Sequence, residues 1–134
     1  MPTSKELTIR MDDQPGILGR CCKALAASGI NILAFQAVPS EANSVVRMVV
    51  DNPTTAKEVL DREHLSYKET EIAQAGLTNR PGELARAATQ LGEANINIEH
   101  AYSGLDGKNS PVVFFAVKDV SKAVAVLDKI AKAA

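Results

Sequence analysis

Two short turns carry the residues of this chain that are best suited to holding a ligand. Each joins Pro and Gly to polar neighbours, in the hexapeptides Asp13–Leu18 and Asn79–Leu84. A turn of this kind starts a helix, and the first backbone N–H groups of a helix lack intrahelical partners. These groups and the helix dipole attract anions such as carboxylates, and Gly leaves room for their approach. From the residues alone we favour a plain strand-to-helix turn, in which Pro only starts the helix, and the repetition does not discriminate, because duplication copies structural turns too.

Cys21 and Cys22 are the only cysteines of the chain. Adjacent residues of a helix point about 100° apart, so they make poor partners for one tetrahedral metal ion. The residues found 66 positions further along are Ala87 and Ala88, which shows that these positions require small apolar side chains. We therefore expect core packing rather than thiol or metal chemistry here, and no metal site.

The rest of the sequence offers no catalytic set. His64 and His100 are the only imidazoles, and no Ser/His/Asp arrangement can be assembled around them. His64 is expected at the end of a helix, where a cation is favourable, and His100 in a cleft of the second half only. Neither a phosphate-binding loop nor a dinucleotide fingerprint is present, so we expect no catalysis and no cofactor.

Composition excludes further classes of partner. The net charge is −1 with acids and bases interspersed, Trp is absent, and aromatic residues make up 4%. Nucleic-acid binding is therefore not expected. No apolar run approaches the roughly 18 residues of a membrane span, so no membrane association is expected either. The N-terminal residues lack the apolar core of a signal peptide, and neighbouring cysteines cannot form an ordinary disulfide, which together favour a cytoplasmic location.

The two turns belong to a longer internal repeat. Pro81 follows Pro15 by 66 residues (81 − 15 = 66), and Ile30-Asn31-Ile32 returns as Ile96-Asn97-Ile98. A repeat of this length exceeds the roughly 20–50 residues of a solenoid unit. It indicates a small duplicated domain, with the first copy in residues 1–70 and the second in residues 71–134.

Hydrophobic periodicity orders the elements within each copy. In the first copy it predicts strands over 6–11, 31–38, 45–50 and 67–71, with one helix starting near Leu18 and ending at Gly29, and another capped by Asn52. The second copy predicts strands over 72–77, 98–102 and 112–117 and two helices. The fold class is α+β, with two ferredoxin-like (βαββαβ) units in tandem, the second of which lacks its last strand.

That missing strand has a structural consequence. No Gly or Pro linker separates the copies, so the last strand of the first should run directly into the first strand of the second. The joined strand around 67–77 would then present an unpaired edge in the second copy, and proteins pair or cover such edges. We expect a homodimer or larger closed assembly to cover it, or else the residues before Leu7 of the same chain.

The motifs together resemble a known family. The order strand, Asp/Asn-x-Pro-Gly-x-Leu, helix, Gly-Ile-Asn-Ile or Ala-Asn-Ile-Asn-Ile, strand, strand, helix looks like the ACT domain. The whole chain resembles small stand-alone bacterial proteins made of two such domains. This resemblance implies amino acid binding between ACT domains, by the turn before the first helix and the start of the second strand of a neighbour. It nominates as ligand-binding residues Asp13, Gln14, Gly16, Ile17, Leu18, Asn31, Asn79, Arg80, Gly82, Glu83, Leu84 and Asn97, with Asp13 or Glu83 for the ammonium group.

Three functions remain open from the sequence. The favoured one is a non-catalytic, allosteric regulatory protein that binds an amino acid between ACT domains. The second is a regulatory subunit that docks on an amino-acid biosynthetic enzyme. The third, motivated only by Cys21-Cys22, is a metal carrier of ferredoxin-like fold. Fold-level analogy alone does not rank them.

Overall fold

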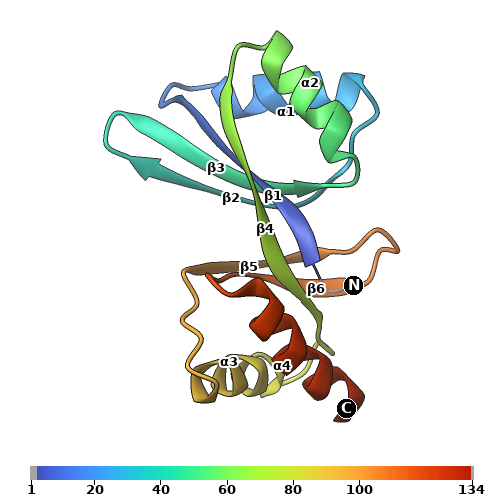
Figure 1. Ribbon diagram of the computed structural model, residues 1–134. Helices are drawn as coiled ribbons and strands as arrows, with labels where there is room; N and C mark the ends of the chain where they lie inside the picture. Colours follow the sequence, from blue (N-terminus) through green and yellow to red (C-terminus); the bar gives the residue numbers. More distant parts are fainter. Residues whose placement is uncertain (1–2, 134) are drawn as a thin grey trace. The chain divides into compact units, whose positions relative to one another are not determined.

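The chain runs through the same order of strands and helices twice. The computed structural model describes residues 3–133 (Figure 1). The elements are β1 (Thr3–Asp12), α1 (Ile17–Ala27), β2 (Ile32–Ser40), β3 (Asn43–Val50), α2 (Pro53–Arg62), β4 (Ser66–Gly76), α3 (Glu83–Glu93), β5 (His100–Leu105), β6 (Pro111–Ala116) and α4 (Val120–Ala133). The strand order is β2-β3-β1-β4-β6-β5. The predicted α+β fold of two ferredoxin-like units is confirmed, and within residues 3–133 no strand follows α4.

The first compact unit is Lys5–Thr70. In it β1 pairs antiparallel with β3, and β3 pairs antiparallel with β2. Both α1 and α2 cover the same face of these strands (Figure 1). The alternation predicted for β1 places its apolar residues between sheet and helices, where the buried core consists of Leu7, Ile9, Met11, Cys21, Leu25, Ile30, Val46, Met48, Val50, Ala56, Val59 and Leu60.

The second unit starts at Glu71, and Thr3 and Ser4 group with it. Here β6 pairs antiparallel with both β4 and β5, while α3 and α4 pack on one face (Figure 1). The apolar positions of α3 recur at helical spacing, as the sequence predicts. The core of this unit consists of Ala73, Ala75, Ala87, Leu91, Ile96, Phe115, Val117, Ala123, Leu127 and Ile130.

One continuous strand serves both copies. β4 extends over 11 residues without a break, which confirms the predicted joined strand. Its neighbour in the second unit is the beginning of β1, where the Ser4 hydroxyl donates a 2.6 Å hydrogen bond to Oε1 of Gln74. We expected the β4 edge to be bare unless another chain covered it. That premise is wrong, because the start of β1 lies along this edge. The intrachain alternative, cover by residues before Leu7, is the arrangement in this structure.

Helix ends follow the predicted signals. Asn52 accepts a 3.1 Å bond from the Thr55 N–H, with Pro53 as the first residue of α2. Gly29 follows α1 with a φ of 73°, the left-handed geometry that a glycine adopts without strain. The turn glycines Gly16 and Gly82 have φ values of 89° and 92°. A Cβ at either would meet no atom within 4 Å, so the cost of substitution there is backbone strain rather than crowding.

Candidate functional site

The turn before α3 has an open helix start. Gly82 is the N-terminal cap residue of α3, and no side chain caps the helix. The Arg80 N–H donates to the Thr78 carbonyl at 2.9 Å, and the Arg86 N–H donates to the Gly82 carbonyl at 2.9 Å. The Glu83 N–H donates to the Arg80 carbonyl at 3.4 Å. The N–H groups that follow it in the first helical turn have no intrahelical partner, which favours a bound anion.

The turn before α1 has the same backbone. Gln14 N–H donates to the Asp12 carbonyl at 2.9 Å, and Arg20 N–H donates to the Gly16 carbonyl at 2.9 Å. Gly16 likewise caps α1 without help from a side chain. The duplication therefore preserved the turn itself, and any functional difference between the copies arises from their side chains.

Charged side chains distinguish the second turn. Glu83 is only 9% exposed, and each of its carboxylate oxygens contacts an arginine. Nε of Arg80 donates to Oε2 at 3.3 Å, and a terminal nitrogen of Arg86 donates to Oε1 at 3.2 Å. Desolvation raises the pKa of Glu83, but the hydrogen bonds from Arg86 and Arg80 outweigh it and bring the pKa below its ordinary value. Glu83 is thus a carboxylate already paired with two guanidinium groups.

A recess of about 380 Å³ opens beside this turn. Four residues of the predicted ligand set line it, and the remainder of the wall comes from the two residues that follow β4 and from the β5–β6 hairpin. The lining is Leu77, Thr78, Asn79, Arg80, Glu83, Leu84, Ser103, Gly104, Leu105, Pro111, Val112 and Val113. Leu84 and Leu105 are 56% and 38% exposed, two of the four large apolar side chains exposed in the described part of the chain.

The hairpin that completes this recess was absent from the sequence-based set. Cross-strand pairing places Leu105 opposite Pro111 and Ser103 opposite Val113. Its loop is fixed by Asp106, whose carboxylate accepts the N–H groups of Lys108 at 2.8 Å and Ser110 at 3.0 Å. These two backbone bonds lower the pKa of Asp106. Asp106-Gly107 marks the loop in the sequence, but only the strand order brings the hairpin beside the turn.

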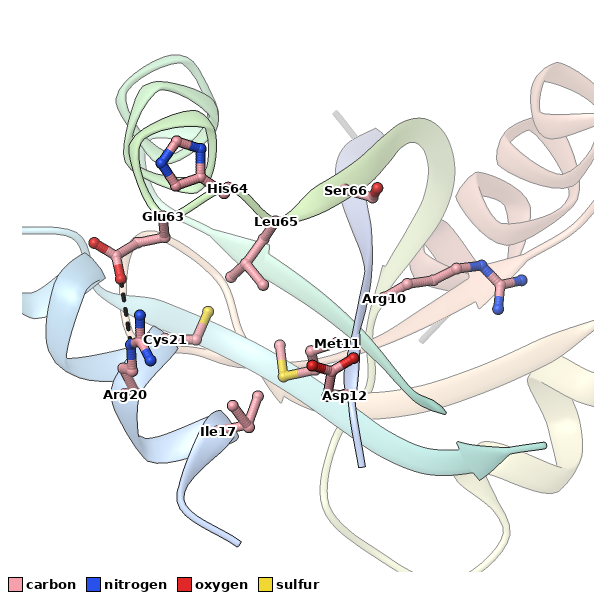
Figure 2. A pocket seen from close by; sticks show the side chains of 10 residues that line it. All are labelled: Arg10, Met11, Asp12, Ile17, Arg20, Cys21, Glu63, His64, Leu65 and Ser66. Carbon is pink, nitrogen blue, oxygen red and sulfur yellow. Dashed lines mark ion pairs between the residues drawn. The ribbon is translucent and has the colours of Figure 1, made fainter. Parts of the chain in front are cut away.

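The first copy lacks the charged network. Gln14 and Ile17 stand where the second copy has Arg80 and Glu83, so Arg20 pairs instead with Glu63, at 3.8 Å and largely in solvent. The recess of about 290 Å³ in this copy lies between α1 and the segment after α2. Figure 2 shows Ile17, Arg20 and Cys21 projecting from α1 towards Glu63 and Leu65. Of the predicted ligand residues of this copy, only Ile17 lines it.

Other predicted residues lie elsewhere. Asp13 is exposed and accepts a long 3.4 Å bond from the Ser44 hydroxyl. The Asn31 N–H donates to Oδ1 of Asp51 at 3.0 Å, which fixes the start of β2. Asn97 lines a separate recess of about 350 Å³ in the second copy, together with Lys118 and Lys122 and not with Arg80. Leu18 packs against the core of the first unit.

His100 and His64 take different positions. His100 lies on β5 and stacks on Tyr102, with ring centroids 6.2 Å apart. His64 follows α2 with a φ of 58° and lines the recess of the first copy (Figure 2). Neither belongs to a group of three metal-ligating side chains within the described residues.

Both cysteines are expected to react slowly. Cys21 is buried in the core, which confirms the prediction from Ala87, and burial raises the pKa of its thiol to about 11. Burial also raises the pKa of Cys22.

Because the thiolate is the nucleophile, a pKa of about 11 makes alkylation of Cys21 at pH 8 roughly 100-fold slower than that of free cysteine. Mass spectrometry of iodoacetamide reactions on Cys22→Ala and Cys21→Ala would measure each thiol alone; rates equal to free cysteine would contradict this.

Two βαββα repeats, each with a glycine-capped turn before its first helix, are the arrangement expected of paired ACT domains. The family model described as the ACT domain pair matches residues 2–133. The chain belongs to this family. A search of curated proteins gave no match. Within the described residues, none of the helices has both the length and the apolar character needed to cross a membrane.

Solved structures of similar fold include protein BT0572 of Bacteroides thetaiotaomicron, 25% identical with a TM-score of 0.84, over 96% of this chain and 88% of that one. The ligand-free regulatory subunit of aspartate kinase from Thermus thermophilus is 20% identical with a TM-score of 0.64, over 96% and 91%. That of Thermus flavus is 19% identical with a TM-score of 0.61, over 96% and 92%. Because the two Thermus proteins are only 20% and 19% identical to this chain, the comparison with them shows a similar fold and nothing more.

Proposed function

We propose that this protein is a non-catalytic regulatory protein that binds an amino acid at an ACT-domain turn, with a neighbouring ACT domain of a homodimer completing the site. The observation that carries the proposal is the recess of the second copy. It joins Asn79, Arg80, Glu83 and Leu84 beside the open start of α3. Helix N–H groups and a guanidinium suit a ligand carboxylate. Membership of the ACT domain pair family supports an amino acid as the ligand.

A thermal-shift screen against the twenty amino acids tests the proposal. A true ligand is expected to stabilise the native protein by RT ln(1 + [L]/Kd), about 2.7 kcal/mol at a hundredfold excess over Kd. The shift should rise with the logarithm of ligand concentration, unlike a nonspecific solute effect. If none of the twenty produces such a dependence at millimolar concentration, amino acid binding is wrong.

A second candidate is a regulatory subunit that docks on an amino-acid biosynthetic enzyme. It is motivated by the two Thermus proteins of the same fold, which are regulatory subunits of aspartate kinase. Co-purification of a biosynthetic enzyme whose activity then depends on this protein would favour it. The metal carrier is the weakest candidate, because Cys21 is buried in the core with a raised pKa.

A further inference from the structure

The recess beside α3 has a charged end and an apolar end. At the charged end, Arg80 and Glu83 line the recess next to the helix N-terminus, while Arg86, the second partner of Glu83, lines a separate recess. Arg80 contacts Glu83 through Nε, and its side chain, which lines the recess, is 60% exposed. A guanidinium with free terminal nitrogens binds a carboxylate in a bidentate manner.

The rest of the lining carries no charge. It is largely apolar, with Leu77, Leu84, Leu105 and Val113, and includes the hydroxyl of Ser103. Large apolar side chains that remain exposed beside a cavity mark a surface that another apolar group covers. The recess volume of about 380 Å³ lies within the range of small-molecule sites.

The two ends together select a ligand class. A carboxylate is favoured near Arg80, while a charged side chain would lose its hydration among the leucines without an opposite charge to pair with. An aliphatic side chain loses nothing and buries apolar area. Glu83 already forms ion pairs with two arginines, so it does not attract a basic side chain of a ligand.

The first copy does not repeat this arrangement. Gln14 carries no charge at the position of Arg80, and Ile17 replaces Glu83. Its recess is instead lined by ionisable side chains of both signs, including Arg20, Glu63 and His64 (Figure 2). Selection of the ligand therefore resides in the second copy.

We propose, resting on the proposed function, that the second copy selects an aliphatic α-amino acid of the leucine, isoleucine and valine type. The carboxylate lies against Arg80 and the start of α3, and the side chain lies among Leu77, Leu84 and Leu105. The first copy does not bind this class.

Titration calorimetry with L-leucine, L-alanine, L-aspartate, L-lysine and L-leucinamide tests the selection. We expect leucine to bind at least 10-fold more tightly than alanine, because even one methylene is worth about 10-fold in a fitted apolar pocket. Leucinamide, which lacks the carboxylate, should bind at least 10-fold more weakly than leucine. The stoichiometry should be one leucine per chain.

Two variants separate the ends of the recess. Arg80→Gln introduces the residue type that the first copy has at this position. It should weaken the binding of leucine and of alanine alike, by about 10-fold or more. Leu105→Ser should weaken leucine at least 5-fold more than alanine. The control Arg20→Gln changes an exposed arginine of the first copy and should leave both affinities within twofold.

The outcomes distinguish this inference from the proposed function. Binding of aspartate or lysine in preference to leucine, or loss of leucine binding in Arg20→Gln rather than Arg80→Gln, overturns the inference and leaves amino acid sensing intact. Absence of binding by every amino acid overturns both.

Discussion

Replacing Phe115 with alanine is expected to cost the second unit about 3–5 kcal/mol of unfolding free energy, as large-to-small changes of buried aromatic residues do. Phe115 is 1% exposed and belongs to the core between the strands and helices of that unit. The change removes apolar contacts from both layers and leaves a cavity in their place. Urea denaturation followed by circular dichroism would measure the loss as a lower midpoint.

Phe35 provides a matched control on the first unit. It is the same residue type on a strand, but it is 57% exposed on β2. Phe35→Ala should change the unfolding free energy by about 0.5 kcal/mol or less, since exposed positions contribute little packing. Similar losses in the two variants would mean that Phe115 does not occupy the core described here.

Most of the fold could be predicted from the duplicated sequence, because the periods of helices and strands depend on the local pattern of apolar and polar residues. The alternation of Glu6–Met11 and the Asn52-Pro53 cap are local signals, and the structure has both as expected. Strand ends were less accurate. The strand predicted from Ile98 begins at His100, after Asn95 with a φ of 62° has turned the chain at the end of α3. Such left-handed turns at non-glycine residues leave a weak sequence signal.

The candidate site was predicted only in part, and the reason is physical. The helix-start turn is encoded by contiguous residues, so the resemblance to the ACT domain could nominate Arg80 and Leu84. The wall formed by Leu105 and Pro111 depends on strand order, which contiguous sequence does not display. Either Asp13 or Glu83 was expected to receive a ligand's ammonium group. The spacing of three residues between Glu83 and each arginine instead favours two ion pairs, a signal that the sequence did contain.

The second large prediction concerns the start of β1, which lies along the β4 edge. Removing the residues that precede Lys5 is expected to expose the β4 edge of the second unit, because Thr3 and Ser4 belong to that unit. An exposed edge recruits another chain. We expect the truncated protein to lose about 1–3 kcal/mol of unfolding free energy, the value of one or two net hydrogen bonds and their packing. We also expect it to associate more strongly than the intact chain of 14.2 kDa.

Light scattering over a range of concentrations would measure that association. Ser4→Ala is the control, since it removes only the 2.6 Å side-chain bond to Gln74 and keeps the backbone of β1. It should cost about 0.5–1.5 kcal/mol and leave the mass unchanged. Because the β4 edge is covered from within the chain, the homodimer proposed above would use another surface. A truncated protein with the stability and mass of the intact chain would show that β1 does not protect this edge.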